Sequence, residues 1–126
     1  MKRGLENMNW RSRCTVSCAL DVVGDKWSLL VVRDLLLYQQ RSFTEFTKAP
    51  EGIATNILSS RLKKLKECGL IQQSCDERTN KKVYTLTESG RDLEGVLRMT
   101  DAWSRKHLKN YQTQLVTVDD MGLSGS

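Results

Sequence analysis

The segment that spans residues 52–71, GIATNILSSRLKKLKECGLI, constrains the fold of this chain more than any other. Leu58, Leu62 and Leu65 recur at spacings of four and three residues, which is the spacing of one face of an α-helix. The run stops at Gly69, a residue that adopts a positive φ without a side-chain clash and is therefore favoured just after a helix. The segment predicts an amphipathic helix with one buried face and one free polar face.

Two helices are predicted before this one. In the first of them, apolar residues recur at spacings of four, three and four, in a stripe that Gly24 interrupts: Val16, Leu20, Val23 and Trp27. Asp25 occupies the position of an N-cap before the strongly apolar run KWSLLVVRDLLLY. A helix with so few polar positions must be buried on most sides, so we expect it to form the core.

A short helix should separate the core helix from the amphipathic one. Ser42 and Glu45 form the S-x-x-E pattern of a capping box, in which each side chain accepts a hydrogen bond from a backbone N–H. Phe43 and Phe46 can anchor this helix against the core, and Pro50 ends it. The order predicts a tight turn directly before residue 52.

Two runs with strand-like composition, LIQQSC and KVYTLT, flank the polar loop DERTNK and predict a β-hairpin. Thr87 then caps a last helix, whose apolar stripe is longer than a small domain needs and comprises Leu93, Val96, Leu97, Thr100, Trp103, His107 and Tyr111. The surplus indicates a partner surface. We expect residues 1–13 to be a flexible arm, 14–113 to be one domain, and 114–126 to be a disordered tail.

This order of elements is that of a winged helix-turn-helix domain, an α+β fold that is mostly helical. In such domains the helix after the turn lies in the DNA major groove. At about 100° per residue, the positions opposite the leucines are Asn56, Ser60, Lys63 and Glu67, flanked by Ser59 and Lys64. Amide, hydroxyl and ammonium groups are those that read base edges and phosphates. The hairpin loop adds Arg78, Lys81 and Lys82 as candidate phosphate contacts.

Four segments also resemble the HxlR-type branch of winged-helix transcriptional regulators, relatives of the MarR group: CTVSCALDVVGDKWSLLVVRDLL, RSFTEF, EGIATNILSSRLKKLKECGLI and VYTLTESGRDL. The resemblance covers about Cys14 to about Trp103. It implies a homodimer that is built from the first and last helices, with Val16, Leu20, Leu97 and Trp103 as candidate interface residues. Such a dimer would bind a roughly palindromic operator in double-stranded DNA.

Carried over by position, the resemblance implies a set of DNA-facing residues that largely repeats the geometric one: Thr55, Asn56, Ser59, Ser60 and Lys63, with Arg61 nearer the backbone and Arg78, Lys81 and Lys82 on the wing. In some members of the family a cysteine at the start of the first helix, usually before proline, senses oxidants or electrophiles. Here Cys14 precedes Thr15, so the thiol matches and the proline does not.

A thiolate is favoured at a helix N-terminus and near basic groups, and Arg11 and Arg13 lie close to Cys14 in sequence. Cys14 is therefore the candidate sensor, with an inert thiol as the alternative. Cys68 and Cys75 fit simple packing positions. Neither zinc-finger cysteine spacing nor a second histidine beside His107 is present, so no metal site and no cofactor are predicted.

The chain has 126 residues, enough for one domain, and a formal net charge of +5, which suits a polyanionic partner. It has no apolar run long enough for a membrane span and no signal peptide pattern, so we expect a cytoplasmic protein with reduced thiols and no membrane partner. No glycine-rich phosphate loop or nucleophile elbow indicates an enzyme, and no particular effector is indicated. The alternative function is a winged helix that binds protein without DNA.

Overall fold

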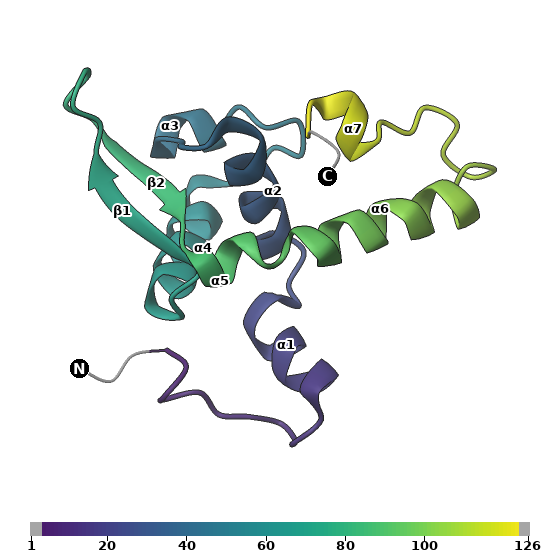
Figure 1. Cartoon of the computed structure of the whole chain (residues 1–126), viewed down its shortest axis with the longest axis horizontal. Helices are drawn as coiled ribbons and strands as arrows, with labels where there is room; N and C mark the ends of the chain where they lie inside the picture. Colours follow the sequence, from purple (N-terminus) through teal and green to yellow (C-terminus); the bar gives the residue numbers. More distant parts are fainter. Residues whose placement is uncertain (1–3, 124–126) are drawn as a thin grey trace.

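Leucines and valines of the second and fourth helices form the centre of the core, which also takes in Phe46, Leu70, Ile71 and Leu86. The structure is a computed structural model and describes residues 4–123 (Figure 1). In chain order its elements are α1 (Thr15–Val23), α2 (Ser28–Tyr38), α3 (Phe43–Phe46), α4 (Thr55–Glu67), β1 (Ile71–Cys75), β2 (Lys82–Leu86), α5 (Glu88–Arg91), α6 (Glu94–His107) and α7 (Val118–Met121). The predicted winged helix-turn-helix order is confirmed.

The ends of the helices follow the predicted capping signals. Asp25 accepts hydrogen bonds from the backbone N–H groups of Trp27 and Ser28, so it caps α2 although the regular helix begins three residues later. The capping box of α3 is complete in both directions. After α4, Gly69 has φ +81°, and the bonds from its N–H and that of Leu70 back into the last turn form a Schellman motif.

The sheet is antiparallel, with Ile71 opposite Leu86 and Cys75 opposite Lys82. Arg41 adds an isolated bridge to Tyr84, through two backbone hydrogen bonds of 2.8 and 3.2 Å. The segment before α3 is therefore tied to the outer edge of β2. This contact fixes the base of the wing next to the α3–α4 pair, while the hairpin loop projects away from the body (Figure 1).

The prediction of one continuous last helix from Thr87 is wrong. Thr87 does cap a helix, but this is the short α5, and a turn at residues 92–93 separates it from α6. The Thr87 hydroxyl also lies within hydrogen-bond distance of the carbonyl oxygens of Gly69 and Leu70, to which it donates. This contact holds α5 against the start of β1. Beyond this turn, α6 packs on α2, and its Leu97 joins the core. Tyr111 lies beyond the end of α6.

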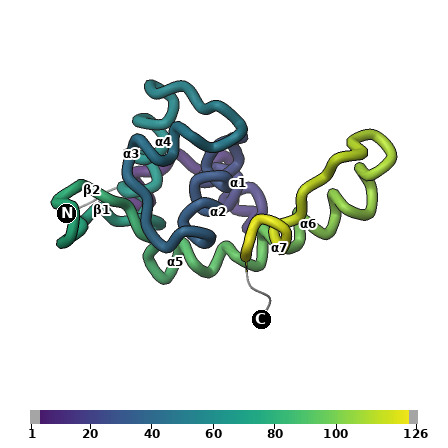
Figure 2. The backbone as a smooth tube through the Cα atoms, turned by 90° about the horizontal axis from the view of Figure 1, so that it is seen from above, coloured from purple at the N-terminus to yellow at the C-terminus, as the bar shows by residue number. Residues whose placement is uncertain are grey.

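The two ends of the described chain are more ordered than the sequence predicted. In the expected flexible arm, Met8 packs against the core and Arg11 pairs with Asp21 of α1. In the expected disordered tail, the chain returns along α6 and forms α7, whose Val118 is buried together with Leu123 (Figure 2). Apolar burial outweighs the weak periodicity of this segment. Residues 1–3 and 124–126 of the arm and tail lie outside the described residues.

Candidate nucleic-acid interface

Helix α4 has two faces of opposite character. Leu58, Leu62 and Leu65 are at most 2% exposed and fill the core. Asn56, Ser60 and Lys63 lie on the opposite side and are exposed, as are Ser59 on its flank and Thr55 in the first turn. Five of the seven residues predicted to contact DNA from this helix are therefore exposed, and helical phase accounts for the outward direction of Asn56, Ser60 and Lys63. We call this set the α4 polar face.

The N-terminus of α4 is open. Its N-cap is Ala54, which offers no side-chain acceptor, and the first turn contains no acidic residue. The turn that delivers the chain to this point includes Gly52 at φ +67°, a conformation that glycine adopts without strain. The backbone N–H groups of a helix start attract phosphate, and here no side-chain cap among the described residues satisfies them.

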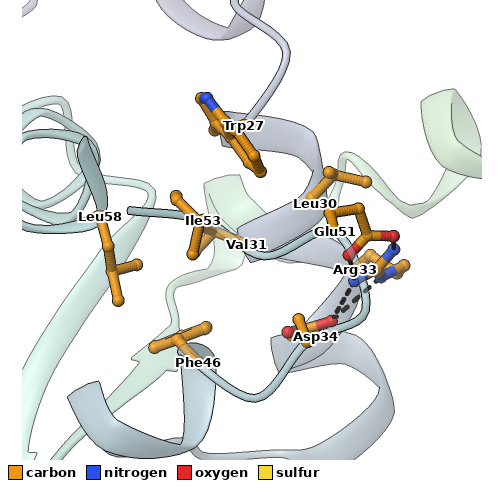
Figure 3. Close-up of a pocket in the computed structure, with 10 residues that line it drawn as sticks. Trp27, Leu30, Val31, Arg33, Asp34, Phe46, Glu51, Ile53 and Leu58 are labelled. Carbon is orange, nitrogen blue, oxygen red and sulfur yellow. Dashed lines mark hydrogen bonds and ion pairs between the residues drawn. The ribbon is translucent and has the colours of Figure 1, made fainter. Parts of the chain in front are cut away.

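The turn before α4 is held from the core side by a partly buried ionic network (Figure 3). The Arg33 guanidinium, on α2, donates to both carboxylate oxygens of Glu51, at 2.7 and 2.9 Å, and to Asp34. Burial alone would lower the pKa of Arg33, but its hydrogen bonds to Glu51 and Asp34 outweigh burial and raise it. The network fixes the position at which α4 starts relative to α2.

The hairpin loop presents the predicted cations to solvent. Arg78, Lys81 and Lys82 are all exposed. Asp76 organises the loop. Its carboxylate accepts hydrogen bonds from the backbone N–H of Arg78 and from the side-chain amide of Gln40. The bond from the Arg78 backbone lowers the pKa of Asp76, so this side chain stays ionised and organises the loop.

A hollow joins the α4 polar face to the wing, and it is lined by Phe43, Ser59, Leu62, Lys63, Lys66 and Tyr84. Lys66 was not among the predicted contacts. It is exposed, and its ammonium group donates to Gln73 of β1 at 3.2 Å. The signal in the sequence was its spacing of three residues from Lys63 and seven from Ser59, which places all three along one edge of the helix.

Arg61 and Lys64 are not on the α4 polar face. The Nε atom of Arg61 forms an ion pair with Oδ1 of Asp25 at 3.0 Å, and the Lys64 ammonium group donates to the Asp21 carbonyl oxygen at 3.0 Å. Both side chains turn toward the corner between α1 and α2. The sequence could not show this, because the partners lie far away along the chain.

Cys14 is exposed at the N-cap of α1. The backbone N–H groups of Ser17 and Val16 lower the pKa of its thiol, as predicted for a helix N-terminus. The predicted contribution of Arg11 is not found, because this side chain pairs with Asp21 instead. The Cys18 thiol donates to the Ser12 carbonyl oxygen at 3.4 Å. Burial raises the pKa of Cys68, consistent with a packing role. Cys75 is exposed at the end of β1, so the expectation that it packs is wrong.

Three of the four candidate dimer residues are exposed. Val16 and Leu20 lie on the surface of α1, and Trp103 of α6 is 58% exposed. Leu97 is only 7% exposed and belongs to the core of this chain, so the prediction that it faces a partner is wrong. The exposed apolar residues next to it on α6 are Val96 and Met99. We call Val96, Met99 and Trp103 the α6 apolar surface.

Two features are absent from residues 4–123. No group of three or more His, Cys, Asp and Glu side chains in this part of the chain has an arrangement that could hold a metal ion. In the same range, no helix is both long enough and apolar enough to cross a membrane.

The sequence model of the family described as HxlR-like helix-turn-helix matches residues 22–112. The chain belongs to this family. The HxlR-like match includes α2, α4 and the whole wing, and ends before α7. The chain is accordingly a transcriptional regulator of the helix-turn-helix type, and the family and its regulators are not enzymes.

Individual relatives agree with the HxlR-like assignment. The uncharacterized HTH-type transcriptional regulator YdeP of Bacillus subtilis is 34% identical over 95 residues, which is 75% of this chain and 73% of YdeP. The crystal structure of PA1607, a putative transcription factor, is 38% identical with a TM-score of 0.70, covering 77% of this chain and 67% of that one. The structure of reduced YodB from B. subtilis is similar over 79% of this chain and 98% of YodB, with 27% identity and a TM-score of 0.63. The structure of diamide-treated YodB is also similar.

Proposed function

We propose that this chain regulates transcription by binding a roughly palindromic operator in double-stranded DNA as a homodimer. The observation that carries the proposal is the α4 polar face, which is exposed along a helix whose opposite side is fully buried. Its groups match the needs of base readout: Asn56 can bind adenine through two hydrogen bonds, and Lys63 can reach guanine or phosphate. Ser59 and Ser60 can pair with most bases.

The remaining contacts in this proposal position the protein on the duplex. The open N-terminus of α4 receives a phosphate, with the Thr55 hydroxyl beside it. Arg78, Lys81 and Lys82 on the wing follow the backbone or enter the minor groove. Lys66 lies between these two regions, in the hollow that joins the helix to the wing. Contacts of this kind supply affinity and register and carry little sequence information.

Homodimer formation is supported by the exposed apolar residues of α1 and α6. Large side chains such as Met99 and Trp103 are costly to leave in water, and a second copy offers the same surface in return. A two-fold axis would place two recognition helices in successive major grooves, roughly 10 base pairs apart from centre to centre.

The experiment that tests this function is selection of bound sequences from a random duplex pool at two salt concentrations. Enrichment of an inverted repeat is the expected result. Binding without an enriched sequence, and with a steep salt dependence, would indicate phosphate contacts alone and overturn sequence-specific recognition. No binding in the presence of reductant would favour the alternative of a protein-interaction module, although the α4 face has the polar character that such a module does not need.

Oxidation of Cys14 is a second proposed property, as a switch of DNA binding. Cys14 is exposed, and the start of α1 lowers the pKa of its thiol, so a thiolate is available for attack on an oxidant. The similarity to YodB, which has been solved in reduced and diamide-treated forms, supports the same direction.

A further inference from the structure

Two cationic side chains of α4, Arg61 and Lys64, do not lie on the α4 polar face. Arg61 and Lys64 follow directly after Ser60 and Lys63. Each side chain is therefore rotated about the helix axis by about 100° from its outward neighbour. Both side chains are partly buried, and both end on the corner that joins α1 to α2. The recognition helix is thus attached to the N-terminal part of the chain by polar contacts along one flank.

Asp25 has two roles at this corner. Its carboxylate caps α2, through hydrogen bonds from the N–H groups of Trp27 and Ser28, and the same Oδ1 atom lies 3.0 Å from Nε of Arg61. The side chains of Asp25 and Arg61 are 21% and 28% exposed, which limits screening of their attraction by solvent. One carboxylate therefore joins the first turn of the core helix to the middle of α4.

Asp21, which lies in α1 four residues before Asp25, makes the second connection. Its backbone carbonyl accepts the Lys64 ammonium group at 3.0 Å. Its side chain accepts hydrogen bonds from both the backbone and the guanidinium of Arg11. The contacts run continuously from the arm before Cys14, through α1, to the second half of α4.

We infer that Asp25 and the Asp21 carbonyl position the recognition helix, and that Arg61 and Lys64 act on DNA through this positioning and not by direct phosphate contact. The inference rests on the proposed DNA-binding function and deepens it. It also makes the position of α4 depend on that of α1, because a displacement of α1 would move the Asp21 carbonyl oxygen that binds the Lys64 ammonium group.

The alternative, in which Arg61 contacts phosphate directly, makes the opposite prediction for a variant that removes the charge of Asp25. If Arg61 contacted phosphate, removal of the Asp25 charge would release a competing anion and strengthen operator binding. If Asp25 positions α4, the same removal weakens binding. Asp25→Asn is the suitable change, since asparagine caps a helix about as well as aspartate and so preserves the start of α2.

The test measures operator affinity by fluorescence anisotropy across a series of KCl concentrations, with the duplex obtained by selection. Loss of a phosphate contact reduces the slope of log K against log salt by about one for each subunit. Lys63→Ala is the reference for that outcome. Arg61→Ala, Lys64→Met and Asp25→Asn are each expected to weaken binding, by about threefold to thirtyfold for coupled contacts, with the wild-type slope.

A further expected result is that Asp25→Asn together with Arg61→Ala weakens binding no more than either change alone, because both remove one contact. Thermal unfolding of every variant shows whether the fraction folded at the assay temperature is unchanged. Tighter binding by Asp25→Asn, or an Arg61→Ala slope reduced like that of Lys63→Ala, would overturn the inference while leaving the proposed function intact. A wild-type protein that binds no duplex would overturn both.

Discussion

The guanidinium of Arg33, buried in α2, holds the carboxylate of Glu51 through two hydrogen bonds of 2.7 and 2.9 Å across 18 residues of sequence. Glu51 stands in the turn immediately before the recognition helix. The pair is therefore placed to decide where α4 begins. A bidentate arginine–carboxylate pair is directional as well as attractive, which makes it suitable for fixing a turn.

Glu51→Gln should destabilise the fold by about 1 kcal/mol, a value that allows for partial solvent exposure of this carboxylate. The hydrogen bond from Arg33 holds the pKa of Glu51 below its ordinary value. Its contribution is thus present above about pH 4.3, the ordinary value, and is lost as the pH falls through the folded-state pKa. Urea unfolding from pH 3 to pH 7 should show a smaller acid-side slope for Glu51→Gln than for the exposed control Glu67→Gln; equal slopes would contradict the role of the pair.

Asn56→Ala and Lys63→Ala should both weaken operator binding, with different signatures. Asn56→Ala should cost about 1–3 kcal/mol and relax base preference at one position of each half-site, because a bidentate contact is lost. Lys63→Ala should weaken binding to all sequences more evenly if it contacts phosphate. Repeating the selection with each variant measures this, and unchanged binding by both would remove α4 from the interface.

Cys14→Ser should abolish any loss of DNA binding that diamide or a quinone causes in the wild type. The reason is that serine keeps the shape of the N-cap and lacks an oxidisable thiol. Operator binding before and after treatment, followed by reductant, is the measurement. Cys75→Ser is the matched control, because it removes another exposed thiol and should leave the response intact. A Cys14→Ser protein that responds like the wild type would exclude Cys14 as the sensor.

Met99→Glu and Trp103→Glu should shift the proposed homodimer toward monomer, because each places a charge in the exposed apolar surface that we propose a second copy covers. Sedimentation equilibrium over a range of protein concentrations measures the shift. Tyr111→Glu changes a side chain that is 87% exposed and lies beyond α6, so it should leave the association unchanged. Association that survives both α6 variants would place the dimer contact elsewhere.

Leu123→Ala should lower the free energy of unfolding by about 2 kcal/mol, although it lies outside the part of the chain that matches the family. Leu123 is buried, and it lines a hollow with Leu35, Leu36 and Leu86 after α7 turns the chain back. Val116→Ala, at an exposed position of the same segment, should change stability by less than about 0.5 kcal/mol. Equal denaturation midpoints for the two variants would show that α7 does not pack as described.

Local patterns predicted much of this fold, because their causes lie within a few residues. The Ser42–Glu45 capping box and the glycine after α4 appear in the structure as the sequence indicates. The leucine spacing in α4 predicted the buried side and, opposite it, Asn56, Ser60 and Lys63 of the α4 polar face, while Thr55 was implied only by the family resemblance. Signals of this kind depend on backbone hydrogen bonds and on helical period, which neighbouring residues determine almost alone.

Predictions that depend on distant partners were less successful. Leu97 carries the same apolar signal as Val96 and Trp103, yet it packs into the core of its own chain while they remain exposed. The packing of α6 on α2 decides between these outcomes. Residues 118–123 show the same limitation, because burial of Val118 against the rest of the fold is not encoded in a local periodicity.

The sequence by itself determined the order of elements from α1 to β2, the resemblance to the family, and the chemical character of the face that we propose reads DNA. The tertiary structure decided which cations of α4 are available to it, since Lys63 is free of the corner that engages Arg61 and Lys64. The physical reason is that helical phase fixes the direction of a side chain about its own axis. The partner it meets there, 43 residues away for Lys64, depends on how whole elements pack.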